Sequence, residues 1–224
     1  MTALVVASLT LREVARRRAV VALLLGMPLC FYLARRELPG QSTRFLAMGI
    51  GWAVSTLTLF VVNGSRRVDP RLRLTGASLP SLVGGRLLAM TGAGVVLASA
   101  YWVLVELDQD VRRPWAIGPM LILPALVGAP LGSFIGGLLP RELEGALTLL
   151  TISAVQMIAN PEGTLARFMP FWSSREIASY AIDGTGSGDA WRALLHAGVT
   201  LLLATLAALA LSARRLSVAR YPEP

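Results

Sequence analysis

The sequence contains no lysine, one cysteine and one histidine, and only 15% of its 224 residues are charged. A Walker-type phosphate loop needs a lysine to reach the phosphates of ATP, so we expect no such nucleotide site in this chain. Zinc chemistry of the HExxH type needs two histidines, whereas His196 stands alone. Cys30 lies within an apolar run, which excludes a disulfide framework or a thiolate metal site inside one chain.

Long apolar runs dominate the composition, since 54% of the residues are hydrophobic and the mean hydropathy is +0.62. Soluble domains carry about 25% charged residues, and here the few charges gather in short clusters between the apolar runs. All 21 basic residues are arginine, which is typical of a GC-rich bacterial genome, and the formal net charge is +8. Because no basic stripe with interleaved aromatic residues is present, we expect no nucleic-acid partner. The pattern predicts an all-α integral membrane protein, surrounded by lipids, in a bacterial plasma (inner) membrane.

Six apolar segments predict membrane-spanning helices, most of them near the roughly 20 residues that cross about 30 Å of hydrocarbon. They cover residues 19–38, 45–63, 86–107, 115–139, 143–159 and 191–212, and the fifth is short. Three arginines before the first segment resemble the start of a signal peptide, but the segment ends in Arg35 and Arg36 and not at a small-residue cleavage site. We therefore expect a retained first span, within a single transmembrane domain that covers residues 1–224.

Residues 1–18 predict an amphipathic helix before the first span. Ala7, Leu11, Val14 and Ala15 share one helical face, and charged residues occupy much of the rest. Such a helix suits the headgroup plane of a bilayer, which makes it an interfacial helix. A cytoplasmic extension of the first span is the alternative interpretation.

Six spans place both termini on the same side of the membrane. Cytoplasmic termini put 13 of the 21 arginines inside, as the positive-inside rule favours. Two connections are longer than simple turns, namely residues 64–85 inside and residues 160–190 outside. The outer connection contains two amphipathic stretches, which we expect to form a re-entrant segment at the outer interface. It ends in a Gly-rich loop, after which Asp189 is predicted to cap the last helix.

The fourth span is the most irregular of the six. Prolines 119, 124 and 130 interrupt it, and Gly128, Gly132 and Gly136 recur every four residues. Glycines at this spacing give a smooth face that lets another helix approach closely. Prolines inside a span need neighbouring helices or local bends to satisfy the carbonyls they free. We interpret this face as a helix-packing surface, with a conformational hinge as the alternative.

One motif of a known enzyme class occurs in the chain. Residues 186–189 spell the GxGD of intramembrane aspartyl proteases, whose paired carboxylates share a proton and activate water. That chemistry needs a second membrane-embedded aspartate, and every other aspartate falls in a predicted loop, so we expect no catalytic residue. No carboxylate lies deep within a predicted span, which disfavours a proton- or sodium-driven transporter. His196 is interpreted as an interfacial or packed side chain.

The order of these parts resembles the membrane subunit of a type-2 ABC exporter. The resemblance is carried by LREVARRRAVVALLLGMPL near the start, SRRVDPRLRLTGASLPSLVGGRLLA between spans two and three, LPRELEGALTLL after the fourth span and ARFMPFWSSREIASYAI before the sixth. Many family members carry Glu-Gly-Thr where this chain has DPRLRLTGAS. The resemblance covers nearly the whole chain and implies a type-2 ABC transporter permease fold, with six transmembrane helices after an N-terminal elbow helix.

The resemblance also implies how the chain would work. A separate ABC ATPase, in two copies, would bind ATP and magnesium, because this chain is expected to bind no cofactor itself. A second permease subunit, identical or homologous, would complete the pathway. The segment 64–85 would couple to the ATPase through Arg66, Arg67, Val68, Asp69, Arg71, Leu72, Arg73 and Leu74. An ordinary positively charged anchor is the alternative for this segment.

The family places the substrate route between the second and fifth spans of the two halves, which here nominates Trp52, Thr56, Gln156 and Met157. Apolar walls predict a hydrophobic or amphipathic cargo, such as a drug, an antibiotic, a lipid-like metabolite or a peptide. The predicted function is therefore ATP-driven export by a permease that is not itself an enzyme. The alternatives are a permease of the same architecture for haem, lipid or a polysaccharide precursor, a membrane-embedded enzyme, and a scaffold that recruits partners.

Overall fold

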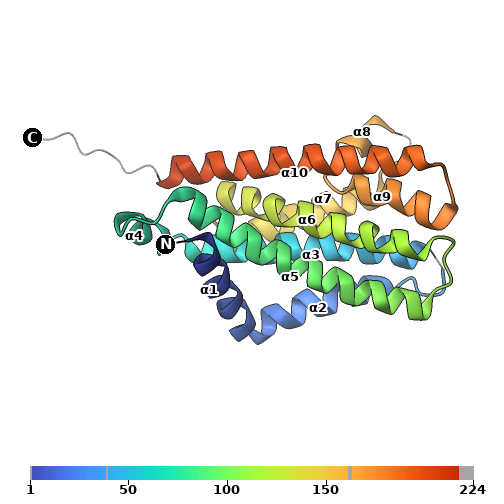
Figure 1. Cartoon of the computed structure of the whole chain (residues 1–224), viewed down its shortest axis with the longest axis horizontal. Coiled ribbons are helices and arrows are strands. Elements are labelled where there is room, and N and C mark those ends of the chain that lie inside the picture. Colours follow the sequence, from blue (N-terminus) through green and yellow to red (C-terminus); the bar gives the residue numbers. More distant parts are fainter. Residues whose placement is uncertain (1, 39, 161–162, 217–224) are drawn as a thin grey trace, which may run out of the picture.

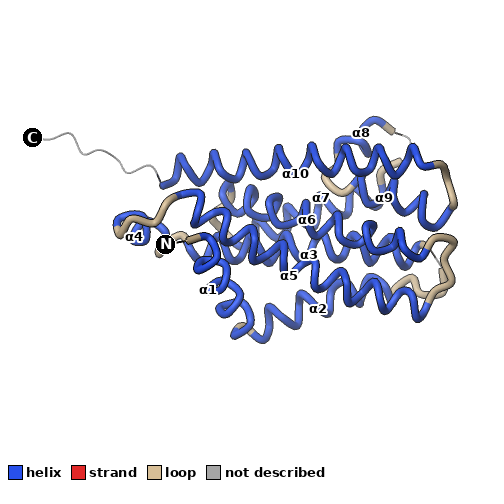
Figure 2. The backbone as a smooth tube through the Cα atoms, in the orientation of Figure 1, coloured by secondary structure: helices blue, strands red, loops and turns tan. Residues whose placement is uncertain are grey.

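The structure, a computed structural model, describes residues 2–38, 40–160 and 163–216. Residues 161–162 of the predicted outer connection and the chain beyond residue 216 therefore lie outside the described residues. Within the described ranges the regular secondary structure is helical and no strand occurs (Figure 2). The elements in chain order are α1 (Ala3–Arg16), α2 (Arg18–Leu33), α3 (Gln41–Ser65), α4 (Asp69–Leu74), α5 (Leu79–Asp108), α6 (Pro114–Leu138), α7 (Glu142–Ile158), α8 (Thr164–Phe168), α9 (Trp172–Ala178), the π-helix η1 (Ser179–Asp183) and α10 (Ser187–Leu216).

The described helices are compatible with a membrane protein. Four of them, α3, α5, α6 and α10, are long and apolar enough to cross a bilayer. A further apolar helix, α2, is shorter, with 16 residues, and α7, with 17 residues, carries two glutamates in its first turn. The prediction of an all-α fold is thus confirmed for the described residues, and four apolar helices of spanning length are compatible with the predicted membrane protein. Each predicted span corresponds to one helix, whereas the count of six membrane crossings stays a prediction.

The most buried long helix is α3, which packs most extensively against α6. The two helices meet on the glycine face of α6. A Cβ atom placed on Gly128 would lie 2.9 Å from the carbonyl oxygen of Gly51. A Cβ atom on Gly132 would lie 2.9 Å from the Cα of Ser55 and closer still to its carbonyl. Glycine therefore sets the separation of the two helices, because any side chain at Gly132 would have to push their backbones apart.

Pro124 opens the middle of α6, because it lacks the N–H that would bond the carbonyl of Met120 four residues earlier. The hydroxyl of Ser174 in α9 donates a hydrogen bond to this carbonyl at 2.9 Å, in a buried position. A buried carbonyl without a donor would cost free energy, so the contact stabilises both the proline site and the position of α9.

The lateral surface of the bundle is apolar. On α10 the exposed side chains include Leu194, Leu195, Val199, Leu202, Leu203 and Leu206. On α5 they include Leu88, Val96 and Val103. Exposed apolar side chains in such numbers suit hydrocarbon and not water.

The first helix, α1, lies at an angle to the long helices and contacts the beginning of α5 (Figure 1). Val6 and Ala7 are buried, and Gly85 of α5 provides the space into which Val6 fits. Leu11 and Ala15, which were predicted on the same apolar face, are exposed. Ala7 and Val14 of the predicted face are thus buried, whereas Leu11 and Ala15 project away from the bundle, and the interfacial position of α1 stays a prediction.

Candidate functional site

The short helix α4 stands at one end of the bundle, near the described start of the chain and the last turn of α10 (Figure 1). We call this end the α4 end. The connection that contains α4 comprises residues 66–78, shorter than the predicted 64–85, because the helices on both sides are longer than predicted. Pro70 in the first turn favours the start of α4, and Gly76, at φ +90°, lets the chain turn away after its end.

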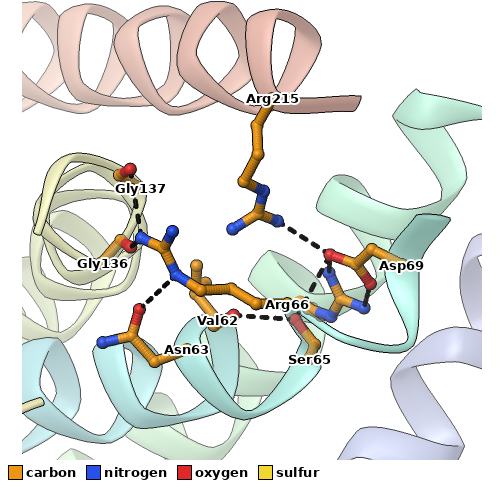
Figure 3. Close-up of polar contacts among 9 residues, drawn as sticks. Val62, Asn63, Ser65, Arg66, Asp69, Gly136, Gly137 and Arg215 are labelled. Atoms are coloured by element: carbon orange, nitrogen blue, oxygen red, sulfur yellow. Dashed lines mark hydrogen bonds and ion pairs between the residues drawn. The ribbon is translucent and has the colours of Figure 1, made fainter. Parts of the chain in front are cut away.

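Asp69 is the only acidic residue of this connection, and its side chain is 0% exposed. The guanidinium of Arg86 in α5 donates two hydrogen bonds to the carboxylate, one of them at 3.0 Å. Arg215 in the last turn of α10 donates another at 2.8 Å. A single carboxylate therefore fastens α4 to the ends of two long helices (Figure 3).

Arg66, at the junction of α3 and α4, binds the end of α6. Its guanidinium donates to the side-chain oxygen of Asn63 at 2.8 Å and to the carbonyls of Gly136 and Gly137, at 2.5 and 3.3 Å (Figure 3). The last carbonyls of a helix have no partner within the helix, so an arginine there satisfies them and complements the negative end of the helix dipole. Burial lowers the pKa of the Arg66 guanidinium.

This cluster, which we call the Asp69 cluster, consists of Arg66, Asp69, Arg86 and Arg215. It holds three cations and one anion. Two guanidinium nitrogens of Arg215 are buried without a hydrogen-bond partner in the described part of the chain. Because a buried charge without a counter-ion is strongly destabilising, the arrangement depends on the one carboxylate.

The other side chains of the connection differ in exposure. Arg67, Val68, Arg71 and Leu74 are exposed, and we call these four side chains the α4 surface. Leu72 is half-buried against a small apolar cluster that includes Leu216 of α10. Arg73, also half-buried, donates to the carbonyl of Ala77 at 3.1 Å.

The predicted docking residues therefore divide into two sets. The direct contact with a partner that was predicted for Asp69 does not fit the structure, because its carboxylate is buried and shared by two arginines. Arg66 is likewise engaged inside the bundle, by the carbonyls of α6. Only the α4 surface offers its side chains freely to another molecule.

The four residues predicted to line a substrate route do not all line one cavity. Gln156 and Met157 line a cavity of about 110 Å³ at the end of the bundle opposite α4, which we call the α9 end. Trp52 and Thr56 lie within α3, 8% and 1% exposed, and do not line this cavity. Their indole N–H and hydroxyl group have no hydrogen-bond partner in the described part of the chain.

Arginines also organise the loops of the α9 end. Arg36 pairs with Asp108, which accepts a further hydrogen bond from the hydroxyl of Tyr32 at 2.5 Å. Arg113 donates to the carbonyls of Tyr180 and Thr185, at 2.7 and 2.9 Å. Its guanidinium also lies 4.0 Å from the centre of the Tyr180 ring, a cation–π geometry.

The residues considered for enzyme chemistry have structural contacts. Asp189 lies in the first turn of α10, two residues after the helix begins, and pairs with Arg192. It therefore does not occupy the predicted cap position, although its charge suits a helix N-terminus. His196 packs edge-to-face on Trp172 and contacts the carbonyl oxygen of Arg167 at 3.0 Å. The described residues contain no group of three or more histidine, cysteine or acidic side chains that could hold a metal ion.

Sequence reasoning missed Arg86 and Arg215, the two partners of Asp69. A lone aspartate among many arginines signals that an ion pair is present, but it does not say which arginine the fold brings close. A scan of the chain against protein-family models and a search of curated proteins find no match. Function is therefore inferred below from the contacts of the α4 end and the α9 end.

Proposed function

We propose that this chain is the membrane permease subunit of an ATP-driven exporter with a type-2 ABC permease fold, and that its α4 surface docks a separate ATPase. The observation that carries the proposal is that some residues of the 66–78 connection bind the bundle while others are exposed. Its half-buried Arg66 and buried Asp69 bind α5, α6 and α10, and its exposed side chains are left for a partner. An ordinary positively charged anchor would need the exposed arginines but not these ties to three helices.

The chemistry of the α4 surface suits a groove with an acidic rim. Val68 and Leu74 are 50% and 78% exposed, so a partner would remove apolar surface from water by covering them. Arg67 and Arg71 add two positive charges, and the one acid of the connection is turned inward. A partner that presents carboxylates there would be attracted and correctly oriented.

The Asp69 cluster provides the route by which a partner could move the bundle. A displacement of α4 acts through Asp69 on α5 and α10, and through Arg66 on the end of α6. In this proposal Asp69 is a coupling residue that transmits force and not a residue that contacts the ATPase. ATP hydrolysis on the ATPase, which holds ATP and magnesium, thereby changes the packing of helices that line the pathway.

The proposal also sets orientation and assembly. The α4 end and both termini face the cytoplasm of a bacterium, an orientation that the arginines near α4 support. The helices α2, α3, α5, α6, α7 and α10 all cross the plasma (inner) membrane. Two ATPase copies and a second permease, identical or homologous, complete the exporter. Its cargo is a hydrophobic or amphipathic compound, such as a drug, an antibiotic, a lipid-like metabolite or a peptide.

Charge reversal on the α4 surface tests the proposal. The tagged chain is purified from its own membranes in a mild detergent, and both the retained Walker-type ATPase and its nucleotide hydrolysis are measured. With Arg67→Glu/Arg71→Glu, hydrolysis in the purified complex should fall by about tenfold or more, because like charges would then face each other across the interface. The matched control is Arg12→Glu/Arg16→Glu, which reverses two exposed arginines of α1.

Both double variants should melt within about 2 °C of the wild-type chain, since exposed substitutions rarely change stability by more than about 0.5 kcal/mol. The docking proposal is wrong if the two variants lose the ATPase equally. It is also wrong if the wild-type chain alone, without any nucleotide-hydrolysing companion, transports its cargo in vesicles.

A further inference from the structure

The cavity at the α9 end has an unusual lining for a membrane protein. It lies where α3, α7 and α9 meet and has a volume of about 110 Å³. Its lining residues are Arg44, Phe45, Met48, Gln156, Met157, Ser174 and Arg175. Two arginines and no acidic residue face it, and the remaining side chains are apolar or already partly hydrogen-bonded.

Gln156 supplies a buried donor without an acceptor. The residue is only 5% exposed, and its side-chain amide oxygen accepts a hydrogen bond from the backbone N–H of Phe171 at 3.1 Å. Because the partner is a donor, it fixes which end of the amide is oxygen. The NH₂ group of Gln156 has no partner in the described part of the chain. A ligand that fills this vacancy must therefore present an acceptor.

Arg175 supplies a cation that no carboxylate contacts within the described residues, although the negative charge of Glu176 acts on it from nearby. It forms no ion pair within the described residues, and its one hydrogen bond there is a long one of 3.4 Å to the carbonyl of Ala159. Burial and then repulsion from Arg44 lower the pKa of the Arg175 guanidinium. Arg44 itself pairs with Asp183 at 2.5 Å, so its charge is already balanced. The neighbouring acid Glu176 is held by Arg192.

The apolar part of the lining comes from Phe45, Met48 and Met157. Methionine side chains adapt to varied shapes, and an aromatic ring adds a large apolar face. The volume is well below the roughly 300 Å³ at which pockets enclose a whole drug-sized molecule. It is large enough for a charged head with the first atoms of a chain, and the rest of such a molecule would extend out of the cavity.

We propose that this cavity binds the anionic head of an amphiphile, a carboxylate or a phosphate monoester, with its apolar chain lying along Phe45, Met48 and Met157. The guanidinium of Arg175 and the NH₂ group of Gln156 donate to the anion, and Arg44 adds positive potential. Charge-assisted hydrogen bonds from an arginine fork are the strong and directional contacts that such a head requires. The assignment of this amphiphile as the cargo rests on the proposed transport function, whereas the binding does not.

Binding is measured with the purified chain alone, in nanodiscs of zwitterionic phosphatidylcholine. Radiolabelled octyl phosphate is equilibrated with them by dialysis, and empty nanodiscs serve as the blank for its partitioning into lipid. Two probes of the same design isolate the two halves of the ligand. Octyltrimethylammonium keeps the chain and reverses the charge, and inorganic phosphate keeps the anion without the chain. We expect octyl phosphate to bind at least about tenfold more tightly than either probe.

Two variants locate the site. Arg175→Gln removes the unpaired cation, and Gln156→Glu keeps the acceptor for Phe171 but replaces the free NH₂ group with an oxygen. Each should weaken octyl phosphate binding by about tenfold or more. Arg167→Gln changes an exposed arginine of α8 outside the cavity and should leave the affinity within about twofold. Unchanged melting temperatures, measured on all three variants, show that the fold is retained.

Two results would overturn the inference. One is binding of octyltrimethylammonium or inorganic phosphate as tight as that of octyl phosphate. The other is an equal effect of Arg175→Gln and Arg167→Gln in variants that melt like the wild-type chain. The ATPase is absent from this assay, so failure of docking at α4 leaves the result untouched. If the wild-type chain bound no octyl phosphate but still coupled to the ATPase, the cavity proposal would be wrong and the transport proposal would stand.

Discussion

Removal of the charge of Asp69 is the sharpest test of how the α4 end is built. Asp69→Asn keeps the size and shape of the side chain and leaves Arg86 and Arg215 without their counter-ion. Loss of one partner from a buried ion pair costs about 3–5 kcal/mol. The Arg215 side chain is 21% exposed and the Arg86 side chain 10%, so water reaches part of the cluster and we expect a cost near the lower limit, about 3 kcal/mol. At roughly 2–4 °C per kcal/mol for a chain of this size, the melting temperature should fall by about 6–12 °C.

The assay is thermal unfolding in one detergent, followed by tryptophan fluorescence. Glu144→Gln is the matched control, because Glu144 pairs with Arg141 at the surface, where the side chains are 47% and 80% exposed. Exposed pairs contribute about 0–1 kcal/mol, so this variant should melt within roughly 3 °C of the wild-type chain. Asp69→Asn/Arg215→Gln provides a second control, since it also removes one of the stranded cations.

If the cluster is as described, the double variant should lose about 0.5–3 kcal/mol less free energy of unfolding than the two single variants lose together. The reasoning is refuted if Asp69→Asn melts no lower than Glu144→Gln. It is equally refuted if the effects of Asp69→Asn and Arg215→Gln simply add, because two groups in direct contact must be energetically coupled.

Two further predictions concern packing and the loops of the α9 end. Gly132→Val should lower the melting temperature by about 2–12 °C, because overpacking costs about 1–3 kcal/mol where the helices touch at Gly132. Gly92→Ala on α5, where a Cβ atom would meet nothing within 4 Å, should leave stability unchanged or raise it; equal losses in both would contradict the packing of α3 on α6. Arg113→Lys should accelerate amide hydrogen exchange in residues 179–186 by about tenfold, because a lysine cannot reproduce the two-carbonyl contact and the stacking on Tyr180. Unchanged exchange there would show that Arg113 does not hold this loop.

The helices were predictable because their signals are local. A run of about 20 apolar residues has few alternatives to a buried helix. Each predicted span coincides with one helix to within about four residues, apart from the earlier end of α2 and the earlier start of α5. The glycines of α6 were predictable for a similar reason, since their four-residue spacing places them on one face whatever helix lies opposite. Composition and spacing suffice for such features.

The contacts of the charged residues were not predictable, because they join segments far apart in the chain. Asp69 and Arg215 are separated by 146 positions, and only the packed bundle brings them together. The same holds for the cavity at the α9 end, where Gln156 was nominated from a resemblance but Arg44 and Arg175 were not. A side chain in a short polar connection is expected at the surface, and Asp69 departs from that rule because two arginines compensate its burial.

The proline-opened helix α6 has a consequence for long-range communication. Near one end its Met120 carbonyl is held by Ser174, the residue before Arg175, and at the other its Gly136 carbonyl is held by Arg66. The sixteen residue steps from Met120 to Gly136 extend about 24 Å along the helix. Helix α6 thus connects the cavity with α4, the element proposed to dock a cytoplasmic partner. Pro124 is a position at which this helix can bend. Occupancy of the cavity and movement of α4 therefore both act on α6. A change in the bend of α6 would shift the contacts of Met120 with Ser174 and of Gly136 with Arg66.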